Sequence, residues 1–268
     1  MTPAREHWSH LWRARGLGDA VKRGVARPFG GQVPAGLVWA LRRPLRGEDP
    51  LVTPPSKAGP EAIADPFLRE RLTGRELGMW TLSAHAIDYV VDAARERRPV
   101  LAVEFSSGVS TLVLAHALRA SGAALEAPWV ISVEQDAEHA AATRAMLAAA
   151  GLAEAAQVLH APLVRRPYDG AERPSYDLDG DVLASHIGGR AVGIALVDGP
   201  AAEAGARVTT VPMLCPHLSA PCPLLLDDAL RDGELYAARS WQRSGMLERP
   251  RYDMREGGLL HATLLQCP

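Results

Sequence analysis

Short apolar runs alternate with longer segments of helical periodicity through the middle of this chain. The runs end at polar or turn-forming residues, as buried strands do. Between them, apolar positions recur at helical spacing, for example Ile87, Val90 and Val91, with Ser83 as the expected cap. Because strands that alternate with helices form βαβ units, we predict a parallel sheet covered on both faces. The expected strands are 100–104, 129–133, 157–160, 191–197 and 223–226, and the expected helices are 82–97, 111–120, 137–150 and 232–244.

The pattern changes near the carboxyl terminus. Residues 249–254 and 258–265 read as two strands joined by a turn, which would make the sheet mixed. The insert 163–189 is too polar for a core segment, and we expect it to shape the rim of a pocket. Tyr168 and Tyr176 in this insert are candidates for stacking on a substrate.

The turn after the first expected strand, Ser106-Ser107-Gly108, is built from small residues and follows an acid, Glu104. This order of strand, tight turn and helix start is typical of α/β proteins that bind a nucleotide-like ligand. A dinucleotide fingerprint would place glycines at 106, 108 and 111, and only Gly108 fits. No GK[ST] sequence follows, so a Walker-type phosphate site is also excluded.

Acids follow the other expected strands as well. Glu134 lies where a carboxylate would hold a ribose diol, whereas Asp136 suits a helix cap. Asp198 and Asp228 are candidate general bases for a substrate hydroxyl. Together with Asp227 they are also the oxygen donors that would hold Mg²⁺. The alternative is structural, with Asp198 and Asp228 as helix caps paired with Arg207 or Arg231.

These segments, taken in order, resemble the class I S-adenosylmethionine-dependent methyltransferases. The resemblance covers roughly 78–265 and rests on GMWTLSAHAIDYV, VEFSSGVSTLVLA, SVEQD, LHAPL, LVDGP and LLLDDALRDGE. Ser106 stands in place of the first glycine of E-x-G-x-G. It implies a Rossmann-like α/β fold, a seven-stranded mixed sheet with an antiparallel seventh strand. It also implies a cofactor site comprising Glu104, Ser106, Ser107, Gly108, Ser110, Thr111, Glu134, Gln135 and Leu163.

The resemblance implies methyl transfer from S-adenosylmethionine, and we expect an oxygen atom of a small or carbohydrate-like acceptor to receive it. Asp198 and Asp228 are then the expected catalytic residues, with Asp198, Asp227 and Asp228 as the metal ligands if Mg²⁺ takes part. Two other functions remain open. One is a non-catalytic scaffold with the same fold, and the other is an NAD-dependent oxidoreductase, against which the missing glycines count.

Charge is unevenly distributed along the chain. Residues 1–46 contain nine Arg and Lys residues but only two acids, Glu6 and Asp19, although the whole chain carries a net charge of -2. We therefore expect a basic, Pro- and Gly-rich arm over 1–75 and a methyltransferase-like domain over 76–268. Trp8 and Trp12 beside arginines would allow weak contact of the arm with a membrane surface. No nucleic-acid partner is expected.

Cysteine usage and hydropathy bear on the compartment. Cys215, Cys222 and Cys267 show no metal-ligand spacing, and we expect neither a zinc site nor a disulfide framework. No stretch approaches the roughly 20 apolar residues of a membrane span, and no signal core precedes the first arginines. These features predict a cytoplasmic protein.

Overall fold

The computed structural model describes residues 32–34, 58–98, 101–122, 128–255 and 257–267. Its main sheet has eight strands in the order β1-β9-β10-β8-β7-β2-β3-β4. Five central strands are parallel, whereas β10 runs antiparallel to both of its neighbours. The strands are β1 (Gln32–Pro34), β2 (Leu101–Phe105), β3 (Val130–Glu134), β4 (Ala156–His160), β7 (Val192–Val197), β8 (Cys222–Leu226), β9 (Leu247–Asp253) and β10 (Leu259–Leu264).

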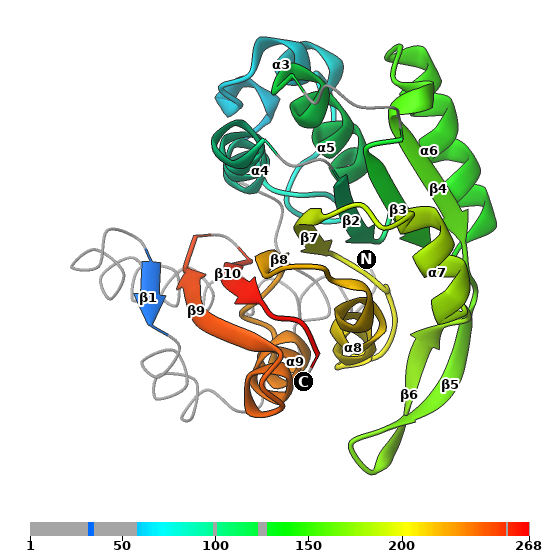
Figure 1. Cartoon of the computed structure of the whole chain (residues 1–268). Coiled ribbons are helices and arrows are strands. Elements are labelled where there is room, and N and C mark those ends of the chain that lie inside the picture. Colours follow the sequence, from blue (N-terminus) through cyan, green and yellow to red (C-terminus); the bar gives the residue numbers. More distant parts are fainter. Residues whose placement is uncertain (1–31, 35–57, 99–100, 123–127, 256, 268) are drawn as a thin grey trace, which may run out of the picture.

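Helices cover both faces of this sheet and make a three-layer structure (Figure 1). On one face pack η3 (Pro60–Ala62), α3 (Pro66–Arg71), α4 (Ala84–Arg97), α5 (Val109–Ala120), α6 (Ala137–Ala149) and η4 (Ala153–Ala155). On the other pack α7 (Gly180–Ile187), η5 (Ala206–Thr209), α8 (Thr210–Leu214), η6 (Cys215–His217) and α9 (Asp232–Arg243). The mixed, mostly parallel α/β sheet predicted from the sequence is confirmed.

Local sequence explains where the helices begin. The Ser83 hydroxyl accepts a hydrogen bond from the Ala86 N–H at 3.1 Å and caps α4, and Asp136 caps α6 through the His139 N–H at 2.7 Å. At α5, the Gly108 N–H donates to Thr111 Oγ1 at 3.0 Å. Gly108 has a φ of +127°, which suits a residue without a Cβ. The starts of α5 and α6 position the polar turns at the carboxyl ends of β2 and β3.

The insert after β4 differs from its prediction. It forms the hairpin β5 (Leu163–Tyr168) and β6 (Ala171–Tyr176), which projects beyond the main sheet (Figure 1), and then α7. Tyr176, Leu183 and Ile187 from this segment are buried in the core. The prediction that the insert is too polar for the core is therefore wrong, because a few apolar positions suffice to anchor a hairpin and a short helix.

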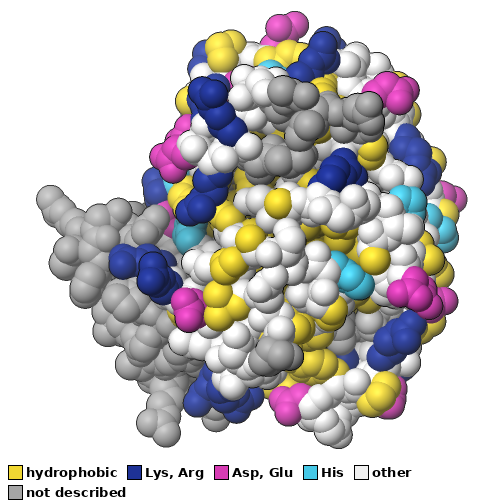
Figure 2. Space-filling model, in the orientation of Figure 1, with side chains coloured by type: hydrophobic (Ala, Val, Ile, Leu, Met, Phe, Trp, Pro, Cys, Tyr) yellow, Lys and Arg dark blue, Asp and Glu magenta, His cyan; other side chains and the backbone are white. Residues whose placement is uncertain are grey.

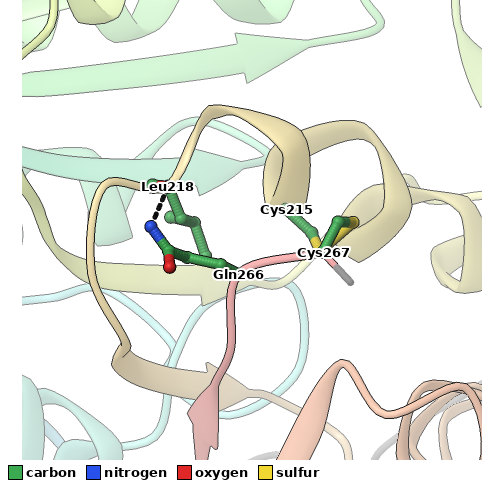
Figure 3. Close-up of a disulfide and its surroundings, with 4 residues drawn as sticks. All are labelled: Cys215, Leu218, Gln266 and Cys267. Atoms are coloured by element: carbon green, nitrogen blue, oxygen red, sulfur yellow. Dashed lines mark hydrogen bonds between the residues drawn. A yellow bond between two sulfur atoms is a disulfide. The ribbon is translucent and has the colours of Figure 1, made fainter.

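A disulfide joins Cys215 to Cys267, which lie 52 residues apart in the sequence (Figure 3). Beside it, the Gln266 side chain donates to the Leu218 carbonyl at 2.9 Å. The prediction that the cysteines form no disulfide is wrong for this pair, since folding of the distant carboxyl terminus onto η6 brings the two positions together. Cys222 remains free and buried, and burial raises the pKa of its thiol to about 12.

The predicted division near residue 75 remains an expectation, although parts of the predicted arm contact the predicted domain. Ile63, Leu68 and Leu72 are buried beside α4 and α5, and Gln32–Pro34 pairs with β9. Trp8 and Trp12 lie outside the described residues. No helix in the described part of the chain is both long and apolar enough to cross a membrane. On the face seen in Figure 2, charged side chains of both signs are interspersed.

Candidate active site

A cavity of about 910 Å³ opens at the carboxyl ends of the parallel strands. The turn after β2 and the end of β3 form one side, with Ser106, Ser107 and Glu134 in its wall. The segments after β7 and β8 form the other side with Asp198, Asp227 and Asp228. Open α/β sheets bind their ligands at this edge. The sequence-predicted ligand side and the sequence-predicted acidic cluster thus share one cavity.

Glu134 is fixed by two hydrogen bonds. One carboxylate oxygen accepts from Ser107 Oγ at 2.8 Å, and the other accepts from the Asp136 N–H at 3.0 Å. Ser107 Oγ is held in turn by Thr143 Oγ1 at 3.0 Å. The side chain is almost completely buried yet lines the cavity. Each oxygen keeps a further lone pair for a ligand hydroxyl, since a carboxylate oxygen can accept two hydrogen bonds.

Ser106 has a φ of +124°, in the region that favours glycine. The turn holds it there, because its N–H donates to the Val133 carbonyl at 2.9 Å and its carbonyl accepts from Ser132 Oγ at 2.6 Å. Its Cβ lies beside Gly199, where an added Cβ would come within 3.1 Å of it. The backbone thus adopts a glycine-like turn with a serine in it.

Of the remaining predicted cofactor residues, Gln135 belongs to the cavity lining and the others do not. The side-chain N–H of Gln135 donates to the Ala201 carbonyl at 3.0 Å. Ser110 and Thr111 are buried in the first turn of α5, and Leu163 starts the β5–β6 hairpin. Gly108 precedes α5. The lining of the cavity includes none of Gly108, Ser110, Thr111 and Leu163.

Glu104 is also absent from the lining, and its side chain is fully buried. Neither of its carboxylate oxygens has a hydrogen-bond partner among the described residues. Burial raises the pKa of this carboxyl to about 8, an effect that the nearby hydroxyls of Thr111, Ser110 and Ser132 only partly oppose. Glu104 is therefore mostly uncharged at neutral pH.

The acidic cluster contains its own cations. One ligand oxygen from each of Asp198, Asp227 and Asp228 lies within 4.8 Å of the others. Arg207 Nη2 bridges Asp198 at 3.4 Å and Asp228 at 3.5 Å, and Arg231 pairs with Asp228 at 2.9 Å. The ion pairs considered as the structural alternative are thus present.

Sequence reasoning missed Glu234, whose Oε1 lies 3.5 Å from Arg207 Nε. Its position three residues after Arg231, in the first turn of α9, is a local signal for an interaction with Arg231 but not for the contact with Arg207. Burial and the neighbouring carboxylates raise the pKa of Asp198 to about 7, although Arg207 lowers it. The pKa values of Asp227 and Glu234 are also raised, chiefly by burial. At neutral pH, Asp198 is therefore poised to accept or release a proton.

Comparison with solved structures identifies the architecture. The chain is 17% identical to cofactor-bound Rv0187 from MTB, with a TM-score of 0.52 over 87% of this chain and 98% of that one. A methyltransferase from Geobacter sulfurreducens shares 18% identity with a TM-score of 0.50, over 76% of this chain and 90% of that one. The SAH-bound Podospora anserina methyltransferase PaMTH1 shares 15%, with a TM-score of 0.50 over 68% and 79%.

This chain has the class I methyltransferase fold. Without the short edge strand β1, the main sheet has seven strands, of which β10 is the antiparallel one. This arrangement agrees with the sheet that the sequence resemblance implied. No family model matches the chain, and no curated protein matches it either. At these identities the comparisons establish the fold alone, and the activity is argued from the site.

The residues of this methyltransferase fold suit S-adenosylmethionine. Beside Glu134, Gln135 Oε1 is buried without a hydrogen-bond partner among the described residues, so a ligand donor would satisfy it. The cavity volume falls within the range of small-molecule and cofactor sites. The small side chains of Ser106 and Ser107 let a ligand approach the turn closely.

The strain at Ser106 leads to a stability prediction. We expect Ser106→Gly to raise the free energy of unfolding by about 1 kcal/mol, because glycine adopts a positive φ without steric cost. Urea denaturation measures this change. The matched control is Ser121→Gly at the end of α5, where φ is -74° and the substitution should destabilise the protein. A lower stability for Ser106→Gly would show that the serine side chain contributes more than its backbone costs.

Proposed function

We propose that this protein is a methyltransferase that uses S-adenosylmethionine and methylates a hydroxyl of a small or carbohydrate-like acceptor. The observation that carries the proposal is the single cavity containing both the Ser106–Glu134 side and the Asp198–Asp228 side. A donor bound on the first side would present its methyl group to an acceptor on the second. Positioning of two reactants in this way accounts for much of the acceleration in group transfer.

In this proposal Glu134 accepts hydrogen bonds from the ribose hydroxyls, and Gln135 accepts one from another polar group of the cofactor. S-adenosylmethionine supplies an electrophilic methyl group on a sulfonium. Asp198 holds the acceptor hydroxyl and takes its proton as the oxygen–carbon bond forms and the carbon–sulfur electron pair passes to sulfur. Asp228, paired with Arg231, orients Asp198 through their shared contact with Arg207.

Binding of S-adenosylhomocysteine tests the cofactor assignment. We expect the protein to bind it in calorimetry, and Glu134→Gln to weaken binding about 100-fold, because hydrogen bonds to a charged group contribute about 1.5–3 kcal/mol each. Glu154→Gln, an exposed acid in η4, is the matched control and should bind normally. Absence of binding to the unaltered protein at millimolar ligand would overturn the proposed function.

The acidic cluster fits a divalent cation in donor type but not in charge arrangement. Carboxylate oxygens are suitable Mg²⁺ ligands. However, Arg207 Nη2 already lies between Asp198 and Asp228, so a metal ion bridging the same oxygens would lie beside a guanidinium. We propose that Arg207 supplies part of the compensating positive charge, in the place where a metal ion would bridge Asp198 and Asp228, and that methyl transfer needs no metal.

Removal of divalent cations tests the role of Arg207. We expect EDTA to leave the transfer rate within twofold of its value in Mg²⁺, and Mg²⁺ alone to leave the melting temperature unchanged. The assay follows S-adenosylhomocysteine release with and without chelator. Loss of activity in EDTA that Mg²⁺ restores would instead assign Asp198, Asp227 and Asp228 as metal ligands.

A further inference from the structure

The floor of the cavity carries more negative than positive charge. Asp228 and Arg231 form one ion pair, and their charges cancel. The other ionisable side chains of the floor are three acids, Asp198, Asp227 and Glu234, and one base, Arg207. Arg207 is only 7% exposed and forms salt bridges with Asp198 and Glu234. Its contact with Asp227 is to the backbone carbonyl, at 2.8 Å, and no salt bridge to the Asp227 carboxylate occurs within the described part of the chain. Among the described residues of the floor, four buried or half-buried carboxylates therefore share two guanidinium groups, because Arg231 also lowers the pKa values of Asp198 and Glu234.

Such an excess of buried negative charge costs free energy unless a cation or protons offset it. The pKa values of Asp198, Asp227 and Glu234 are raised chiefly by burial, and the neighbouring carboxylates raise them further. A bound cation would favour the ionised carboxylates, whereas a bound anion would add to the repulsion. The floor thus discriminates between ligands by the sign of their charge.

An independent observation indicates that a polar ligand belongs beside this floor. Tyr176, from β6, is 1% exposed and lines the cavity, and its hydroxyl has no hydrogen-bond partner among the described residues. The hydroxyl lies against Gly199, the residue after Asp198, since a Cβ added there would be 2.7 Å from Tyr176 Oη. Its ring is held in place by Phe105, with the ring centroids 5.8 Å apart. A buried hydroxyl of this kind needs a partner, and the cavity is where one can reach it.

The cavity lining also includes an aromatic surface. Trp80 lines the same cavity and is 78% exposed, the highest value among the large apolar side chains described. Indole faces attract organic cations more strongly than other aromatic side chains do. A cavity lined by both an exposed tryptophan and a set of acids suits a ligand with an apolar or sugar-like body and a positive charge.

We propose, on the basis of the methyltransferase function above, that the acceptor is a hydroxyl-bearing amine that is protonated at neutral pH. Its ammonium group binds between Asp227 and Glu234, its body lies against Trp80, and Tyr176 hydrogen-bonds to one of its polar groups. Acceptors with a carboxylate or phosphate are excluded by the same charges. The amine is a recognition group, and the methyl group goes to the hydroxyl on Asp198.

Two sets of related probes test this proposal, each with an amine, a neutral compound and an acid built on a similar scaffold. The first set is glucosamine, glucose and glucuronate, and the second is tyramine, 4-ethylphenol and 4-hydroxyphenylacetate. Calorimetry is carried out on protein saturated with S-adenosylhomocysteine in EDTA, so that no metal ion offsets the floor. In at least one set we expect the amine to bind tenfold or more tightly than the neutral compound, and the acid to bind more weakly than both.

A double variant assigns the preference to the floor. Asp227→Asn with Glu234→Gln should reduce the amine preference to less than threefold without changing S-adenosylhomocysteine affinity. Glu248→Gln, an exposed acid on β9, should retain the full preference. If the double variant does not fold, the salt dependence of the unaltered protein decides. Raising NaCl from 50 to 500 mM should then weaken amine binding several-fold and leave the neutral probe unaffected.

The proposal is overturned if neither amine binds more tightly than its neutral counterpart, or if an acid binds best. It is also overturned if the preference survives in the folded double variant or does not respond to salt. These outcomes differ from failure of the proposed function, because saturation with S-adenosylhomocysteine is established before any acceptor probe is added.

Discussion

Asp198→Asn is expected to lower kcat by about 10²–10⁴-fold while S-adenosylhomocysteine binds with unchanged affinity. The asparagine keeps the size of the side chain but cannot accept the acceptor's proton, and general-base catalysis contributes rate factors of this order. The carboxylate lies in the cavity next to Arg207, 3.4 Å away, so it is held in place in the unaltered enzyme. Release of S-adenosylhomocysteine with an accepted acceptor measures the effect.

The pH profile gives this prediction a second readout. Burial raises the pKa of Asp198 to about 7, and a base works only when deprotonated, so kcat should rise with pH through about 7. Because Asp198 and Asp227 interact, the midpoint belongs to the cluster rather than to one residue. The rising limb should disappear in Asp198→Asn and persist in Asp92→Asn, an exposed control on α4. A rising limb in Asp198→Asn would assign the base elsewhere.

Arg207→Leu is expected to reduce the free energy of unfolding by about 3–5 kcal/mol, because it leaves buried carboxylates without their shared cation. Urea denaturation at pH 8 measures the loss. The control is Arg165→Leu, which removes an exposed pair with Glu203 and should cost less than about 1 kcal/mol.

The loss caused by Arg207→Leu should depend on pH in a defined direction. The carboxylates that Arg207 stabilises have pKa values that removal of the guanidinium would raise further. As the pH falls below 7 these groups take up protons and no longer need a cation, so the deficit should shrink at pH 5. A deficit equal at pH 5 and pH 8 would indicate that Arg207 stabilises the fold by packing rather than by charge.

Much of the fold could be predicted from the sequence because period and turn chemistry are local signals. The predicted ends of β2, β7 and β10 and of α4 and α5 lie within two residues of those observed. The strand-end acids were found for the same reason, since parallel strands place their carboxyl ends at one edge. Glu134, Asp198, Asp227 and Asp228 accordingly line one cavity.

Features that depend on distant contacts could not be read in this way. The burial of Glu104 results from packing between β2, its neighbours and α5, and no local pattern indicates that the side chain is fully buried and absent from the cavity lining. The joining of Glu234 to Arg207, and the placement of the Tyr176 hydroxyl against Gly199, likewise bring together segments that are remote in the sequence. The Cys215–Cys267 disulfide belongs to the same class.

The short strand β1 also bears on whether shortened recombinant forms of the protein would aggregate. Gln32–Pro34 pairs with Asp253, Tyr252 and Arg251 and so covers the outer edge of β9 (Figure 1). An uncovered strand edge presents free backbone donors and acceptors on which a second molecule can add a strand. Recombinant forms that begin after residue 34 would expose that edge and be prone to aggregation, so the boundaries chosen for crystallisation or calorimetry should retain this segment.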